Sequence, residues 1–242
     1  MPNWASNINI IYSKEEKTVK DLYEKLHEWI LEPSKCLEAW KGRSNWFSNI
    51  LMQAGIDIKD TTNPVKINYR GEISHTWVPS CSQINNEKYH YLIVYTKTAW
   101  IQTARFWPTL LSKLYPDDDT LGFAYFSEEE NCGVFEKYDP NNMLQLSDLF
   151  TGKETYEVIT NIEDYPKLLH AEFPDNREQI TTEEAKEILE TILDCHLDDN
   201  FEEKINEIQK QMEGKLQEIF GEDAYFHLYP IKEIANLDDE PY

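Results

Sequence analysis

The sequence predicts an α+β protein, an antiparallel sheet with helices on one face that is followed by an acidic helical extension. Strand-like and helix-like periodicities alternate over residues 1–150, whereas helical spacing dominates after about residue 180. Acidic residues concentrate in the second part: residues 151–242 hold 25 acidic and 8 basic residues, against 20 and 15 in residues 1–150. This shift predicts two parts, 1–160 and 161–242.

The first part is expected to open with a strand over residues 6–12, where apolar side chains alternate with period two. Ser13 and Glu16 have the spacing of a capping box, so a helix is expected to follow and to end before Pro33. An insertion is expected at about residues 34–64. It would contain one short helix that ends at Gly55.

The rest of the first part alternates between strand and helix patterns. The elements expected are strands at 65–73 and 90–96, a helix at 103–115, and a β-hairpin of strands at 121–126 and 133–138. Pro108 is compatible with the helix only in its first turn, where no intrahelical N–H is needed.

The second part is expected to be mostly helical. Thr181 and Glu184 repeat the capping-box spacing at the start of one helix. A second helix carries a heptad-like apolar stripe from Phe201 to Ile219, and the break at 198–200 predicts an αα-hairpin between the two. The stripe is compatible with packing inside the chain or with pairing to a partner helix. The acidic tail, 237–242, is expected to be frayed.

Three short motifs resemble the YubB-like family. The chain opens with Met-Pro-Asn-Trp at 1–4, carries Thr-Ala-Trp at 98–100, and has Glu-Glu-Asn-Cys-Gly at 129–133. Family members begin Met-Pro-Asn-Trp-Cys, show the same Thr-Ala-Trp after a strand, and have a Glu-Glu-Pro-Gly-x-Gly turn. This chain departs from the pattern at Ala5 and in the middle of the turn.

The resemblance covers about residues 1–150 and leaves residues 181–242 unexplained. It implies a ferredoxin-like domain from a phage or conjugative plasmid, that is, from a mobile genetic element. The family motifs are structural, so the resemblance brings no catalytic residues, and a fold does not specify an activity.

Composition excludes several classes of function. The net charge of −22 argues against direct binding of nucleic acid, because such proteins present clustered Lys and Arg. Phosphate-binding glycine loops and the serine-hydrolase elbow are absent from the sequence. No signal peptide or membrane span is recognisable, and the sparse cysteines (Cys36, Cys81, Cys132 and Cys195) are interpreted as reduced thiols. A cytoplasmic location is therefore expected.

The search for a metal or catalytic site gives no convincing candidate. Asp117, Asp119, Gly122 and Glu128 match calcium-loop positions, but Leu121 offers no side-chain oxygen at position 5. Adjacent residues on a helix do not face one another, so the Cys195–His196 pair is not a nucleophile and base. Trp77, Trp100 and Tyr138 could stack on bases, but they lack basic neighbours. No metal, no cofactor and no enzymatic activity are predicted.

The function predicted is non-catalytic binding of a host protein, with acidic side chains standing in for phosphates on a basic surface such as that of a nucleic-acid-binding or defence protein. One alternative is an oligomerising scaffold that uses the C-terminal helices, and a second is an enzyme of unrecognised type. The candidate partner-binding residues are Glu183, Glu184, Glu187, Glu190, Asp198, Asp199, Glu202, Glu203, Asp117, Asp118, Asp119, Glu128, Glu129 and Glu130.

Overall fold

The computed structural model describes residues 4–31, 44–58, 70–99, 105–129, 133–147, 150, 153–160, 177–198, 200–235 and 237. The chain divides into two compact units. The first comprises residues 1–149 together with 233–242, and the second comprises residues 150–232. The division lies at 149/150, where the sequence had suggested 160/161, and the C-terminal segment belongs to the first unit.

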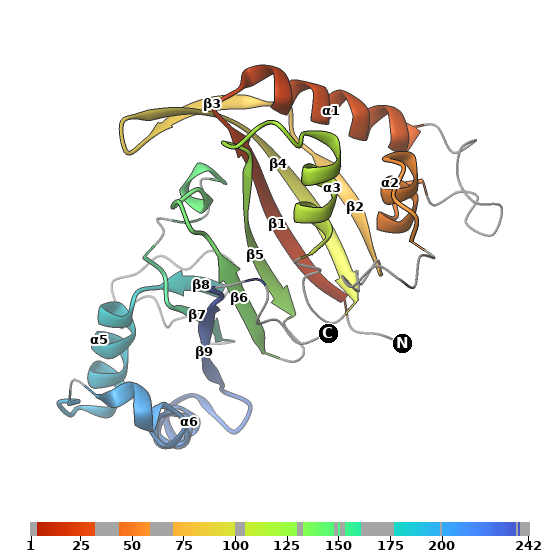
Figure 1. Ribbon diagram of the computed structural model, residues 1–242. Helices are drawn as coiled ribbons and strands as arrows, with labels where there is room; N and C mark the ends of the chain where they lie inside the picture. The colour runs from red at the N-terminus through yellow and green to blue at the C-terminus, as the bar shows by residue number, and fades with distance from the viewer. Residues whose placement is uncertain are drawn as a thin grey trace. The chain divides into compact units, whose positions relative to one another are not determined.

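The first unit is built on an antiparallel sheet (Figure 1). Its elements are β1 (Trp4–Ser13), α1 (Glu16–Leu31), α2 (Phe47–Gln53), β2 (Gly71–Thr76), β3 (Ser80–Ile84), β4 (Glu87–Ala99), α3 (Phe106–Leu114), β5 (Gly122–Glu129), β6 (Val134–Tyr138) and the 3₁₀ helix η4 (Leu144–Ser147). The strand order is β2-β4-β1-β5-β6, and β3 also pairs with β4. Side chains from α1, α2 and α3, including Leu22, Ile50 and Trp107, pack together with Val94 of the sheet.

The expectation of a ferredoxin-like sheet is wrong, although the class α+β is confirmed. The structure describes nine strands, and six of them pair within the first unit alone, so the sheet exceeds a four-stranded one. One unforeseen strand is β3, which forms a hairpin with β4. Asn85 and Asn86 join them with φ values of 51° and 67°. Both values are positive, as a two-residue type I′ turn requires.

Strand β1 is confirmed, but it is buried on both faces. It pairs with β4 on one side and β5 on the other, and Ile10 and Ile11, which point to opposite faces, are both fully buried. The predicted capping box before α1 is wrong. Ser13 lies at the end of β1, and its hydroxyl accepts a hydrogen bond from the backbone N–H of Glu15 (2.9 Å).

A row of polar side chains crosses the helix-covered face of this sheet. Thr96, Asn7, Ser127 and Glu136 are paired in register across β4, β1, β5 and β6, and all four are at most 5% exposed. Asn7 Nδ2 donates to the hydroxyls of Thr96 (3.2 Å) and Thr98 (3.0 Å). Cross-strand neighbours on one face lie close enough for such bonds. Because this row is polar but buried, the pattern of hydrophobic residues in β1 does not identify all of its buried positions.

The insertion agrees with its prediction where it is described. Helix α2 ends next to Gly55, whose φ of 75° is the left-handed conformation expected after a helix. The strand expected at 65–73 lies mostly outside the described residues, and β2 begins at Gly71. Pro108 lies in the first turn of α3, as predicted. The hairpin of β5 and β6 is also confirmed.

The second unit is less helical than predicted. Its elements are β7 (Tyr156–Thr160), β8 (Arg177–Ile180), α5 (Thr182–Leu193), the 3₁₀ helix η6 (Phe201–Lys204), α6 (Ile205–Phe220) and β9 (Phe226–Glu233). Strand β7 pairs antiparallel with both β8 and β9. The helices pack their apolar sides on this three-stranded sheet in one core, so the extension is itself a small α+β unit.

The heptad-like stripe is used inside this core. Phe201, Ile208, Met212 and Leu216 are at most 7% exposed, whereas Ile219 at the end of α6 is 63% exposed. The stripe therefore packs mostly against α5 and the sheet of its own chain, and Ile219 and Phe220 at the end of α6 remain exposed. Within the described residues, no helix is long and apolar enough to cross a membrane.

Candidate functional site

Some acidic residues of α5 support the local fold through hydrogen bonds, and several present exposed carboxylates. The predicted capping box at its start is confirmed: Glu184 Oε2 accepts from the backbone N–H of Thr181 (2.8 Å), and Thr181 Oγ1 accepts from that of Glu184 (3.2 Å). Glu190 accepts from the backbone N–H of Leu197 (2.8 Å), and this bond lowers its pKa. Glu183 and Glu187 are exposed and lie one helical turn apart.

The acidic residues after α5 also include exposed carboxylates and one that supports the local fold. Asp198, Glu202 and Glu203 are exposed. Glu202 accepts a hydrogen bond from the hydroxyl of Tyr156 (2.9 Å), which ties η6 to β7. Asp199 lies outside the described residues. Six of the predicted binding residues in the second unit are therefore exposed, and two of these, Glu184 and Glu202, also support the local fold, as does the half-buried Glu190.

The run at 117–119 forms a turn between α3 and β5. Asp117 and Asp119 are exposed, but Asp118 is held by hydrogen bonds from Ser13 Oγ (2.7 Å) and Thr120 Oγ1 (2.7 Å). Burial alone would raise the pKa of Asp118, yet the hydrogen bonds outweigh it and hold the pKa below its ordinary value. Asp118 is therefore a structural residue of the turn.

The predicted solvated turn at 128–130 is wrong for its described residues. Glu128 and Glu129 continue β5, and Glu129 is only 1% exposed. The strand extends further than expected because its register with β1 and β6 carries on past Phe126. Glu130 lies outside the described residues. This run does not offer a surface for a partner in the way the sequence suggested.

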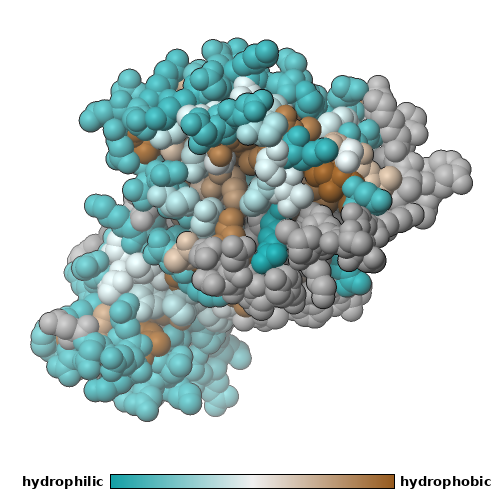
Figure 2. All heavy atoms as spheres, in the orientation of Figure 1, coloured by the Kyte–Doolittle hydropathy of each residue, from teal (hydrophilic) through white to brown (hydrophobic). Residues whose placement is uncertain are grey.

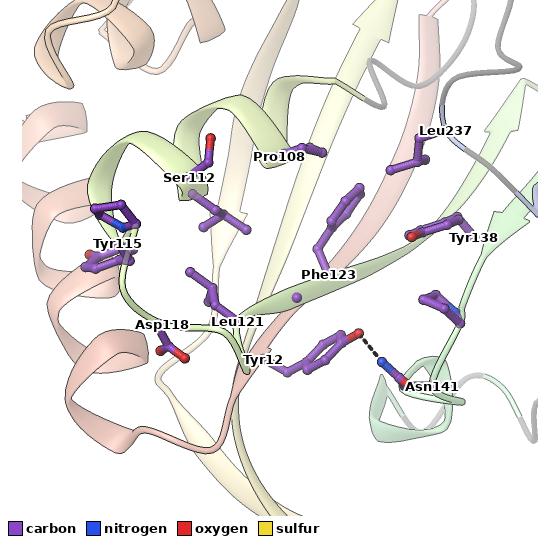
Figure 3. A pocket seen from close by; sticks show the side chains of 14 residues that line it. Tyr12, Pro108, Ser112, Tyr115, Asp118, Leu121, Phe123, Tyr138, Asn141 and Leu237 are labelled. Carbon is purple, nitrogen blue, oxygen red and sulfur yellow. Dashed lines mark hydrogen bonds between the residues drawn. The ribbon is translucent and has the colours of Figure 1, made fainter.

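A groove that sequence reasoning missed lies at the end of the first unit's sheet (Figure 3). It has a volume of about 510 Å³. We call it the aromatic groove; its lining residues are Tyr12, Pro108, Leu111, Ser112, Tyr115, Pro116, Asp118, Leu121, Gly122, Phe123, Tyr138, Pro140, Asn141 and Leu237. These residues come from β1, α3, β5, β6, the segments that follow α3 and β6, and the C-terminal segment, which contributes Leu237. Of its lining residues, the sequence pointed to Tyr138 as a candidate for base stacking and to Asp118 as a candidate for partner binding.

The groove is built from interlocking aromatic rings. The ring centroid of Phe123 lies 5.3 Å from that of Tyr138, which in turn lies 6.1 Å from that of Tyr125. Tyr12 is placed by the absence of a side chain at Gly122, where a Cβ would lie 2.6 Å from the tyrosine hydroxyl. That hydroxyl accepts a hydrogen bond from Asn141 Nδ2 (2.7 Å).

An acidic hollow adjoins the aromatic groove. It has a volume of about 430 Å³ and is lined by Glu15, Thr18, Leu114, Tyr115, Pro116, Asp117, Asp118, Asp119 and Thr120. Tyr115, Pro116 and Asp118 line both depressions, so the two are continuous along the turn after α3. Among the described residues, no basic side chain lines either one. Together they combine aromatic and apolar walls with carboxylates at one end.

Other candidates from the sequence do not assemble into a site. Gly122 and Glu128 lie on β5, so they cannot close a calcium loop with Asp117 and Asp119. Among the residues that the structure describes, no group of three or more His, Cys, Asp or Glu could hold a metal. Cys81 and Cys195 are exposed free thiols, whereas Cys36, Cys132 and Trp100 lie outside the described residues. Trp77 is 54% exposed at the end of β2.

Comparison with known proteins adds no assignment. No protein-family model, no curated protein and no solved structure matches this chain.

Proposed function

We propose that this chain is a non-catalytic binding protein whose acidic surface engages a protein with a basic surface. The observation that carries the proposal is the set of exposed carboxylates on the second unit, Glu183, Glu187, Asp198 and Glu203. Glu183 and Glu187 lie on α5, Glu203 lies on η6, and Asp198 lies between these two helices, whose apolar sides are already packed into a core. Residues 150–232 hold 21 acidic and only 8 basic residues, so few cations are available to neutralise them.

The physical argument is electrostatic complementarity. Exposed charges of one sign steer an oppositely charged partner and make association depend strongly on salt. Hydrophilic side chains cover the visible outer sides of α5 and α6 (Figure 2), so the charges are presented to solvent. The family resemblance supports a more specific version, in which a mobile-element protein occupies the nucleic-acid site of a host protein.

The proposal is tested first with basic nucleic-acid-binding proteins as candidate partners. Tagged protein is incubated with the heparin-binding fraction of a host lysate, which is enriched in basic nucleic-acid-binding proteins. The proposal expects a stoichiometric partner that is released at high salt, since exposed charges are screened beyond about 10 Å at 0.1 M. Double-stranded DNA should displace that partner, because both would occupy one basic surface.

A matched pair of variants distinguishes an effect of this acidic surface on binding from an effect of the net charge of the protein. E183Q/E187Q removes two exposed carboxylates from α5, and E24Q/E28Q removes two exposed carboxylates with the same spacing from α1. At about 0.5–1 kcal/mol for each exposed charge, the first variant should weaken binding about 5- to 30-fold, and the second much less. Equal effects of both variants, or a complex unaffected by salt and DNA, would contradict the proposal.

A further inference from the structure

The geometry of the first unit points to a second binding site: we propose that the aromatic groove binds an extended, proline-containing peptide with a Lys or Arg at one end. This site lies on a different unit from the acidic surface proposed above. The inference therefore does not depend on that proposal, and the two can fail separately. Four features of the groove support it.

The first feature is the composition of the walls. Tyr12, Tyr115, Phe123 and Tyr138 contribute aromatic rings, and three prolines line the rim. Grooves lined by aromatic rings are the usual docking sites of polyproline II segments, because the apolar proline rings pack on flat aromatic faces. Such a segment is already extended before it binds, so little conformational entropy is lost.

The second feature is the supply of hydrogen-bond donors. A polyproline II segment has no internal hydrogen bonds, and therefore its carbonyl oxygens need donors from the groove. The hydroxyl of Tyr12 accepts from Asn141, so its own proton can be donated to a ligand. The hydroxyl of Tyr138, a residue labelled in Figure 3, offers a second donor.

The third feature is charge. The acidic hollow that continues from the groove contains Glu15, Asp117 and Asp119, all exposed, and no basic residue in the described part of the chain lines either depression. A cationic side chain on the peptide would meet these carboxylates while the prolines lie on the aromatic rings. The same charges oppose ligands that carry phosphate, including nucleotides. Charge therefore selects the basic peptide among the ligands that an aromatic groove could hold.

The fourth feature is pre-organisation. Tyr115 donates to Asp21 of α1 (2.8 Å), Tyr12 is held by Asn141, and Asp118 is fixed by its hydrogen bonds in the turn. A site whose walls are fixed before binding avoids the cost of ordering them. Leu237, from the C-terminal segment, also lines the groove, so the site already accommodates an apolar side chain from a distant part of the chain.

The test selects ligands without assuming a sequence. A randomised peptide library displayed on phage is panned against the full chain, with a parallel selection that lacks the bait. The expected result is enrichment of peptides that combine prolines with a flanking Lys or Arg. An enriched peptide is then synthesised with a fluorescent label, together with a version in which the basic residue is Gln, and their affinities are measured by anisotropy.

Two variants locate the peptide on the groove. D117N/D119N removes exposed carboxylates and should weaken binding of the basic peptide about 5- to 30-fold, but should leave the Gln version nearly unchanged. Y138A removes an aromatic wall and should weaken both peptides about tenfold or more. Y95A, which truncates a partly exposed tyrosine of β4 whose ring lies beside His75 outside the groove, is its control. Urea unfolding checks that each variant is folded.

Three results would overturn the inference. The first is a library that yields no peptide above the bait-free selection. The second is enrichment of peptides without the proline and basic combination. The third is a bound peptide whose affinity is the same in D117N/D119N and the wild-type chain, a measurement that remains decisive if Y138A does not fold. None of these results would contradict the separate proposal that the acidic surface of the second unit binds a partner in a salt-dependent way.

Discussion

The indole Nε1 of Trp107 donates a hydrogen bond of 2.8 Å to Oδ1 of Asn9, and both side chains are completely buried. This bond joins α3 to the central strand β1. Asn9 in turn donates to Thr96 of β4 (3.1 Å), so one polar chain links the helix to two strands. Buried polar groups are costly unless they are paired, so this link favours one placement of α3 on the sheet.

Removal of the indole N–H should therefore destabilise the first unit. We expect W107F to lower the free energy of unfolding by about 2–4 kcal/mol, because it deletes a buried hydrogen bond and leaves a small cavity. Urea unfolding monitored by circular dichroism measures the effect. W77F changes a tryptophan that is 54% exposed and should be nearly neutral. Equal stability of the two variants would show that the bond between α3 and β1 contributes little.

Alanine substitutions at two glycines are expected to have opposite effects on stability. At Gly122 an added Cβ would lie 2.6 Å from the ring and hydroxyl of Tyr12, whereas at Gly214, inside α6, it would meet open space. G122A should cost about 1–3 kcal/mol through overpacking, and G214A should add about 0.5–1 kcal/mol, since alanine is the better helix former. Thermal unfolding of both variants tests the pair. A stabilised G122A would mean that Tyr12 moves aside readily, and the groove would then not be rigid.

The capping box at α5 gives a prediction for the second unit. T181A should lower its stability by about 1 kcal/mol, because the N–H of Glu184 loses its acceptor. E184Q should cost less than E184A, since glutamine can also accept from the backbone of Thr181. Hydrogen exchange of the first turn of α5 reports the change directly. Identical exchange in T181A and the wild-type chain would contradict a contribution from the cap.

Asp118 makes stability depend on pH on the acid side. Its pKa is lowered in the folded state, because hydrogen bonds from Thr18, Thr120 and Ser13 outweigh burial. The carboxylate therefore stabilises the fold above its ordinary pKa of 3.8, and this contribution is lost as the pH falls through the lower folded-state value. D118N should be less stable than the wild-type chain at pH 7, by about 1–3 kcal/mol. The difference in the free energy of unfolding between D118N and the wild-type chain should disappear in acid. Urea unfolding at several pH values measures this difference, and a difference that does not change with pH would refute the role of Asp118.

Local patterns in the sequence identified much of the secondary structure. The period of apolar residues located α1, α3, α6 and the long strand β4, and capping chemistry located the start of α5. Such signals succeed because a helix or a cap is satisfied within a few residues. Strand β3 was missed because Ser-Cys-Ser-Gln-Ile shows no alternation, and the Asn-Asn turn that closes its hairpin was not recognised.

Only the tertiary structure decided which polar residues are buried and which meet in a site. Glu129 is buried although two acidic neighbours suggested a solvated turn, because the register of β5 places it on a covered face of the sheet. Tyr12, Phe123 and Tyr138 share one groove although they are far apart in the chain. The sequence by itself determined the charge imbalance, the α+β class and most helices, since these depend on composition and local spacing. Burial and the groove depend on strand register, which is set by contacts between residues distant in sequence.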